Sequence, residues 1–251
     1  MSRDRLDLET YYQSLGIFGK ELEERVTEGL RRIDEGYPIA YLVKEAYFYD
    51  IVLTVDESVL IPRPDTERMV EKALKLLPKA AKIADLGTGS GAIAVTVLYH
   101  LPDASGIAVD LSRDALKIAR HNAIRYGVDG RLRLLEGDMC KGVLGEETFD
   151  LILSNPPYIP TKDILKYPSL AYEPQMALDG GEDGMDFYRT ILAVYRKNLK
   201  AGGGFLFEIG FDQGEAIRAL AQELGYTCAV YKDYGKNDRV ALLYPTADEK
   251  G

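Results

Sequence analysis

Side chains that build metal centres and acid–base triads are scarce in this sequence of 251 residues. Its two cysteines, Cys140 and Cys228, lie far apart and form no CxxC pattern, which is typical of reduced, buried thiols. Its two histidines, His100 and His121, have no second histidine or cysteine at the spacing of metal ligands. We therefore expect no metal site, and a Ser-His-Asp triad is hard to build.

Long apolar runs and an excess of basic residues are also absent. No run approaches the roughly 20 apolar residues that a membrane-spanning helix needs. Residues 1–10 mix charges with few apolar groups, unlike a signal peptide, so we expect a cytoplasmic protein without membrane contact. The net charge of -9 disfavours a duplex-DNA binder, which usually carries a basic face, and is compatible with a protein or small-molecule substrate.

The chain is expected to contain three parts. Residues 1–36 form a short helical region, residues 37–64 a β-hairpin linker, and residues 65–245 the main domain. The hairpin is predicted because the segment from Ile39 onward is rich in Tyr, Val, Ile and Leu and partly alternates. The helical region is predicted from one apolar stripe, made by Leu22, Val26, Leu30 and Ile33.

Short apolar strands alternate with helical segments after Pro78. This alternation predicts an α/β fold with a mostly parallel sheet that helices cover on both sides. The last two strands, 227–231 and 239–244, are separated by a short turn, which favours an antiparallel pair at the sheet edge. The earlier strands are predicted at 82–86, 106–109, 132–135, 150–154 and 204–209.

A glycine-rich turn at the end of the first of these strands is a candidate ligand site. Its spacing is G-x-G-x-G after Asp85, which suits a cationic or hydroxyl-rich ligand better than a phosphate. Asp110, at the end of the next strand, is placed to accept hydrogen bonds from ribose hydroxyls, and Asp138 and Met139 to contact an adenine. Asp110 and Asp138 are alternatively loop or capping residues. The turn itself contains Gly87, Thr88, Gly89, Ser90 and Gly91.

The sequence Asn155-Pro156-Pro157-Tyr158 follows the fourth strand and begins a proline-rich segment, 155–184, that breaks the alternation. A segment of this length inside a domain is usually functional. An amide or aryl amino nitrogen is a poor nucleophile because its lone pair is delocalised. The Asn155 side-chain oxygen and the Pro156 carbonyl are suited to accept both of its N–H bonds, and the two prolines restrict the backbone. Tyr158 can stack on the planar group.

These motifs resemble a known family. The segment from Asp85 to Gly91 is similar to motif I of class I methyltransferases, and Asn155 to Tyr158 is similar to the motif of amino-methyltransferases. The segment Leu60-Ile61-Pro62-Arg63-Pro64-Asp65-Thr66-Glu67 narrows the resemblance to the peptide-chain release factor glutamine N5-methyltransferases, the HemK/PrmC type. The segments Tyr172-Glu173-Pro174 and Asp233-Tyr234-Gly235 agree with this family, and the likeness spans residues 37–244.

The resemblance implies a seven-stranded, Rossmann-like class I methyltransferase fold and the cofactor S-adenosyl-L-methionine. It implies transfer of a methyl group to the glutamine in the Gly-Gly-Gln loop of class I release factors. By position, residues 87–91, Asp110, Asp138 and Met139 would bind the cofactor. Asn155 would lie between the cofactor and the glutamine, and residues 155–158 with Arg63 would bind the substrate, with Asn155, Pro156 and Tyr158 as the catalytic residues.

One departure from the family pattern is the N-terminal helical region, which is shorter here. An alternative function is an adenine-N6 methyltransferase acting on nucleic acid, which shares the Asn-Pro-Pro-Tyr motif but usually carries a block of Lys and Arg that this sequence lacks. A second alternative is a cofactor-binding module without activity, which the intact Asn155 disfavours. We expect a monomer that acts on a release factor and does not bind nucleic acid directly.

Overall fold

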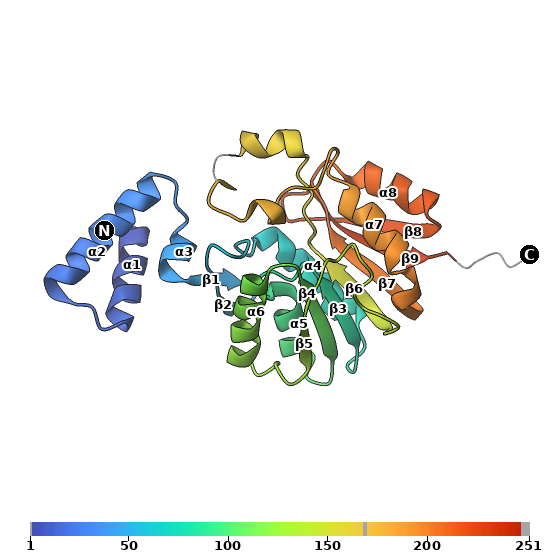
Figure 1. Cartoon of the computed structure of the whole chain (residues 1–251), viewed down its shortest axis with the longest axis horizontal. Coiled ribbons are helices and arrows are strands. Elements are labelled where there is room, and N and C mark those ends of the chain that lie inside the picture. Colours follow the sequence, from blue (N-terminus) through green and yellow to red (C-terminus); the bar gives the residue numbers. More distant parts are fainter. Residues whose placement is uncertain (1, 168–169, 247–251) are drawn as a thin grey trace, which may run out of the picture.

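The computed structural model describes residues 2–167 and 170–246. Its main element is a seven-stranded sheet in the order β5-β4-β3-β6-β7-β9-β8 (Figure 1). The five strands from β5 to β7 run parallel, and β9 runs antiparallel to both of its neighbours. The mostly parallel sheet and the antiparallel pair at its edge are therefore confirmed. The strands are β3 Lys82–Leu86, β4 Ser105–Asp110, β5 Leu132–Glu136, β6 Phe149–Ser154, β7 Leu199–Glu208, β8 Tyr226–Lys232 and β9 Asp238–Pro245.

Helices cover both faces of the sheet, as the alternation predicts, and two separate apolar clusters join them to it. One cluster contains Met69, Ile93 and Leu98, from helices on the first face. The other contains Tyr188, Ile191 and Ile217, from helices on the second face. The strands between them are buried on both sides, which explains their nearly continuous apolar sequences. The first face carries α4 Pro64–Leu76, α5 Ala92–His100 and α6 Arg113–Arg125, and the second carries α7 Asp186–Val194 and α8 Gly214–Glu223.

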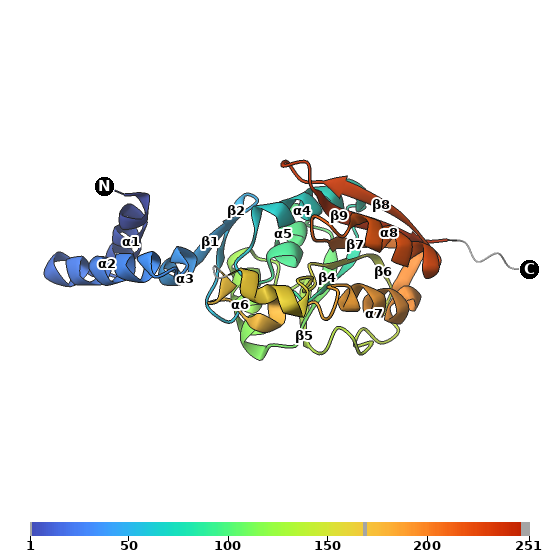
Figure 2. The ribbon, with the colours of Figure 1, turned by 90° about the horizontal axis from the view of Figure 1, so that it is seen from above.

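The N-terminal region forms a third apolar cluster, which includes Leu8, Val26 and Tyr41. Its helices α1 Arg3–Ser14 and α2 Gly19–Asp34 project from the sheet domain and are blue in Figures 1 and 2. The predicted apolar stripe faces this cluster, because Val26 is fully buried and the other three residues pack against it.

The predicted start of the β-hairpin at Ile39 is wrong. Residues Ile39–Val43 form the short helix α3, which begins after Pro38 and ends at Lys44, whose φ of 57° is left-handed. Five consecutive apolar residues carry no period that separates a helix from a strand. The helix is held by Tyr41, whose hydroxyl donates to the Val59 carbonyl at 2.6 Å. The hairpin itself is confined to β1 Glu45–Phe48 and β2 Ile51–Thr54.

Asn122 of α6 fastens the hairpin to the sheet domain. Its Oδ1 accepts from the Thr54 backbone N–H at 2.8 Å, and its Nδ2 donates to the Thr54 carbonyl at 3.0 Å. The same Nδ2 donates to the Ser90 carbonyl at 2.9 Å. Because Asn122 is fully buried, this one side chain joins the hairpin to the glycine-rich turn. Among the helices of the described residues, none is long and apolar enough to cross a membrane.

Candidate active site

The glycine-rich turn connects β3 to α5 and needs backbone conformations that favour glycine. Gly87 and Gly89 have φ values of 73° and 55°. Below the turn lies Asp85, whose Oδ2 accepts from the Thr88 hydroxyl at 2.6 Å and from the Ala94 N–H at 3.3 Å. Burial raises the pKa of Asp85 to about 6. Its Oδ1 is buried and has no hydrogen-bond partner among the described residues, so this end of the site fits a ligand with a cationic group.

Asp110 is the last residue of β4 and contacts the turn from this neighbouring strand. Its Oδ2 accepts from the Gly89 N–H at 2.8 Å, and its Oδ1 from the Ser112 N–H at 2.9 Å. Burial raises the pKa of Asp110, although these backbone donors oppose the shift. Each carboxylate oxygen keeps a second lone pair, so contacts within the loop and contacts with a ligand hydroxyl are compatible.

Asp138 follows β5 and also has partners of its own. Its Oδ1 accepts from the Cys140 N–H at 2.8 Å, and its Oδ2 lies 3.3 Å from the Lys141 ammonium. The backbone N–H of Cys140 is the main cause of the lowered pKa of Asp138. The neighbouring Met139 covers the turn, since a Cβ atom placed on Gly87 would lie 3.4 Å from the Met139 sulfur.

Asp110, Asp138 and the turn line one cavity of about 610 Å³, and Asp85 lies beneath the turn, outside the lining of this cavity. It opens where β3, β4 and β6 end, which is where ligands bind in open α/β sheets. Of the residues predicted for the site, those that line it are Arg63, Gly87, Thr88, Gly89, Ser90, Asp110, Asp138, Met139, Asn155 and Pro157.

Three predicted residues lie elsewhere. Gly91 lies between α5 and α6, where a Cβ atom would be 3.1 Å from Val95 and 3.3 Å from Ala119. Pro156 is buried and is not among the residues that line the cavity. The Tyr158 hydroxyl lies 3.3 Å from the carboxylate of Glu208 on β7.

Asn155 reaches the cavity because β6 pairs in parallel with β3, as its position in the sequence predicts. The pairing places Leu153 opposite Asp85, so the residue two positions later lies beside the glycine-rich turn. Its side-chain Nδ2 donates to the Thr66 hydroxyl at 3.3 Å. The amide is therefore held by α4, the helix that follows the proline-rich approach.

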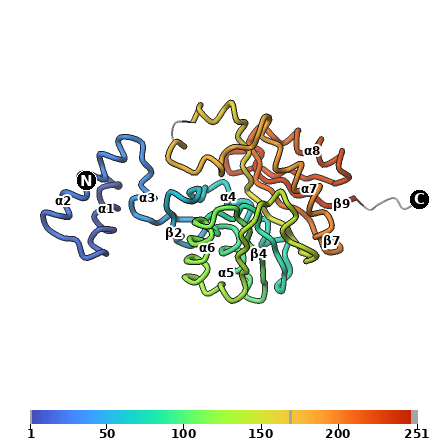
Figure 3. The backbone as a smooth tube through the Cα atoms, in the orientation of Figure 1, coloured from blue at the N-terminus to red at the C-terminus, as the bar shows by residue number. Residues whose placement is uncertain are grey.

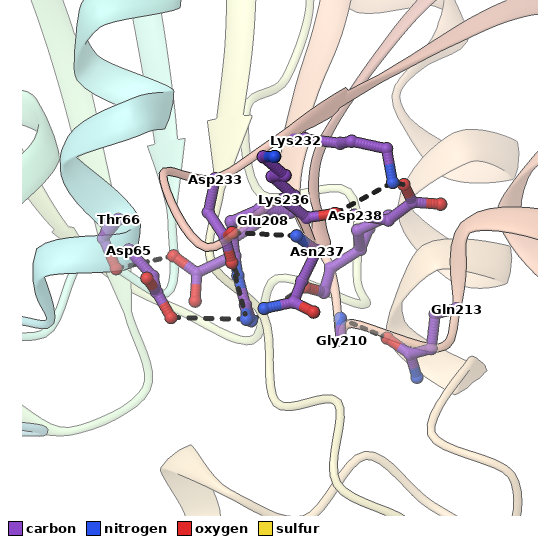
Figure 4. A network of polar contacts seen from close by, with 12 residues as sticks. Asp65, Thr66, Glu208, Gly210, Gln213, Lys232, Asp233, Lys236, Asn237 and Asp238 are labelled. Carbon is purple, nitrogen blue, oxygen red and sulfur yellow. Dashed lines mark hydrogen bonds and ion pairs between the residues drawn. The ribbon is translucent and has the colours of Figure 1, made fainter.

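Thr66 and Glu208 belong to a buried polar network that sequence reasoning missed (Figure 4). The Thr66 hydroxyl donates to Glu208 Oε2 at 2.5 Å. Arg239 of β9 lies nearby, and its guanidinium is 3.3 Å from both Asp65 and Asp233. Thr66 and Glu208 are 142 positions apart, so no local pattern relates them.

Described residues of the proline-rich segment that follows Asn155, among them Thr161, Pro174 and Asp179, line the cavity. The end of this segment leads into α7 (Figure 3). Its buried Glu173 binds back to the approach to α4: the carboxylate accepts from the Ile61 N–H at 3.0 Å and pairs with the Arg63 guanidinium. The positive charge of Arg63, which was predicted to bind substrate, is thus shared with Glu173 at the cavity wall. Tyr172 packs edge-on against Tyr37, with ring centroids 5.1 Å apart, and so reaches the N-terminal region.

The chain is similar to proteins of known activity. A family model described as the methyltransferase small domain matches residues 66–167. The release factor glutamine methyltransferase of Caulobacter vibrioides is 43% identical over 210 residues, which cover 82% of this chain and 72% of that protein. The protein of the same name from Moorella thermoacetica is 39% identical over 245 residues, or 96% of this chain and 83% of that protein.

Solved structures share the fold at lower identity. The hMettl16 catalytic domain has a TM-score of 0.64 at 16% identity and covers 78% of this chain and 76% of that one. An O-methyltransferase family protein from Burkholderia thailandensis has a TM-score of 0.52 at 14% identity and covers 74% and 57%. These likenesses concern the fold, a Rossmann-like sheet of the kind found in methyltransferases.

Proposed function

Because the chain belongs to the family of release factor glutamine methyltransferases, we propose that it methylates the side-chain amide nitrogen (N5) of a glutamine in class I peptide-chain release factors. The methyl donor is S-adenosyl-L-methionine, and the target is the glutamine of the Gly-Gly-Gln motif. The observation that carries this proposal is the position of Asn155, which follows β6 and lines the same cavity as the turn of Gly87 to Ser90.

The residues of the chain fit the cofactor. The turn of Gly87 and Gly89 exposes backbone to the cavity, and Asp85 beneath it carries a buried oxygen without a partner that suits an ammonium group. Asp110 retains acceptor capacity for ribose hydroxyls, and Met139 offers an apolar surface to an adenine ring. We propose these residues, with Thr88, Ser90, Asp138 and Asn155, as the cofactor site.

When bound, S-adenosyl-L-methionine supplies a methyl group on a sulfonium, which is electrophilic. Oδ1 of Asn155, a residue that lines the cavity, would accept an N–H bond of the substrate amide and aim its nitrogen at that methyl, and the buried Pro156 would restrict the backbone beside it. The substrate nitrogen would form its bond to the methyl carbon as the C–S bond breaks, and the methylated nitrogen would then lose a proton to water. Alignment of this kind can supply roughly 7–11 kcal/mol of the barrier. A strong general base is unnecessary because the N-methylated cationic product is very acidic and loses its proton readily.

The three parts of the chain would have different roles in the reaction. We propose residues 65–245 as the catalytic domain, residues 37–64 as a linker, and residues 1–36 as a surface that contacts the release factor. We also propose that the protein acts in the cytoplasm, as a monomer and without binding nucleic acid. The net charge of -9 supports the last point, because nucleic-acid binding requires neutralised phosphates.

Methyl transfer from labelled S-adenosyl-L-methionine to a purified class I release factor tests the proposal. We expect label in the Gly-Gly-Gln peptide, and none when the factor carries Glu in place of that Gln. Label in DNA but not in the release factor would overturn it in favour of adenine-N6 methylation. Asn155→Ala should lower kcat by about 100-fold or more and weaken cofactor binding far less, by about tenfold at most, because the lost contact acts mainly in the transition state.

A further inference from the structure

A side-chain amide can hold a substrate only if its oxygen and nitrogen face the correct ways. Asn155 has two orientations that differ by exchange of Oδ1 and Nδ2, which are similar in shape. Only one of them presents the oxygen to an N–H bond of the substrate. A group outside the reacting pair must therefore select it.

Thr66 is in the position to select this orientation of the Asn155 amide. Its hydroxyl has one proton, and that proton points to Glu208 Oε2, which is only 2.5 Å away. The remaining lone pairs of Oγ1 can only accept, and the Asn155 amide lies 3.3 Å from them. Nδ2 donates to Oγ1 in this arrangement, whereas Oδ1 in its place would meet a lone pair with no proton between the two oxygens.

The acceptor at the far end of this chain of hydrogen bonds is itself held in place. Glu208 is 1% exposed, and its Oε1 lies 3.3 Å from the Tyr158 hydroxyl. Its backbone carbonyl accepts from the buried Tyr188 hydroxyl at 2.8 Å. Because Tyr158 holds the carboxylate and Tyr188 holds the backbone of Glu208, the acceptor of the Thr66 hydroxyl keeps its place.

We propose that Thr66, oriented by Glu208, is a positioning residue that fixes the Asn155 amide with Oδ1 toward the substrate nitrogen. The proposal rests on the function proposed above and adds to it a reason for the threonine at the first turn of α4. Glu208 contributes to the positioning of Asn155 through Thr66, although Glu208 does not line the cavity. Neither residue needs to touch a reacting atom for this effect.

Kinetics of Thr66 variants at about pH 8.5, where Glu208, with its pKa of about 7, is ionised and can only accept, test the proposal. Thr66→Val keeps the shape of the side chain but removes the hydroxyl, and we expect kcat to fall by about tenfold or more while KM for the release factor stays within about threefold. Thr66→Ser restores the hydroxyl and should recover most of that loss. Thr96→Val is the matched control: Thr96 is also fully buried and hydrogen-bonded, to the Ala92 carbonyl at 2.6 Å, but lies within α5 away from Asn155.

Normal kcat in Thr66→Val, or an equal loss in Thr66→Ser, would overturn the proposal, provided that the wild-type protein methylates the release factor. If the wild-type protein does not, the proposed function fails instead, and a second measurement still tests the positioning. The Asn155 side-chain NH₂ signals, assigned by their loss in Asn155→Ala, should exchange with solvent more slowly in the wild-type protein than in Thr66→Val. Equal exchange rates in the two proteins would also overturn the proposal.

Discussion

The buried carboxyl group of Glu208 gives the protein a pH-dependent stability that one substitution can isolate. Burial raises the pKa of Glu208 from 4.5 to about 7, although the hydrogen bond from Thr66 and the positive charge of Arg239 act in the opposite direction. The folded protein therefore binds this proton more tightly than the unfolded chain does. The contribution of Glu208 to the free energy of unfolding is fully present below pH 4.5 and is lost as the pH rises to about 7.

The size of the effect follows from the two pKa values. Each pKa unit corresponds to about 1.4 kcal/mol, so a rise from 4.5 to about 7 gives a loss of about 3 kcal/mol between pH 4 and pH 8. Glu208→Gln has nearly the same shape, and its amide oxygen can still accept from the Thr66 hydroxyl. The amide of this variant cannot titrate, so its free energy of unfolding should not include the loss of about 3 kcal/mol between pH 4 and pH 8.

Urea unfolding of both proteins at several pH values measures the difference. Other carboxyl groups titrate in both proteins and cancel when the two free energies are subtracted. We expect the free energy of unfolding of the wild-type protein, minus that of Glu208→Gln, to fall by about 3 kcal/mol from pH 4 to pH 8. A difference that stays flat, or that rises with pH, would refute the view that burial dominates the environment of Glu208.

Three further substitutions test other parts of the structure. Gly184→Ala would place a Cβ 2.3 Å from the Tyr158 carbonyl oxygen, so calorimetry should show a loss of at least about 2 kcal/mol, against about 1 kcal/mol for the control Gly202→Ala, which also has positive φ but open space. Asn122→Ala should cost about 2–4 kcal/mol in urea unfolding, because buried backbone groups lose their partner. Asp110→Ala should weaken cofactor binding by about 10–100-fold in titration calorimetry, and an unchanged Kd would exclude Asp110 from the site.

Much of the sheet could be predicted because its signals are local. Strands such as 82–86 and 150–154 are short apolar runs bounded by turns, and residues at their ends fall at one edge of a parallel sheet. That rule alone brings Asp110 and Asn155 to one cavity. Ile39–Val43 could not be assigned in this way, because its apolar residues are continuous and tertiary packing decides their conformation.

The residues that hold the site residues in place could not be predicted, because their contacts join segments that are far apart in the sequence. Thr66 is indistinguishable from an ordinary residue of the first helical turn until Glu208 is placed beside it. The same holds for Glu173, whose contact with Arg63 spans 110 positions. Tyr158 is predicted to stack on a planar group, and its hydroxyl has a further partner, Glu208, which the sequence does not indicate.

The place of β9 in the sheet has a consequence for how the protein is made. β9 lies between β7 and β8, although it follows both of them along the chain. While the ribosome is still adding residues, β7 and β8 have no strand to join them, and each leaves a row of backbone groups unpaired. The same late strand carries Arg239, whose positive charge partly opposes the rise that burial causes in the pKa of Glu208. Synthesis of residues 238–245 should therefore be the event that closes the sheet and protects the nascent chain from aggregation.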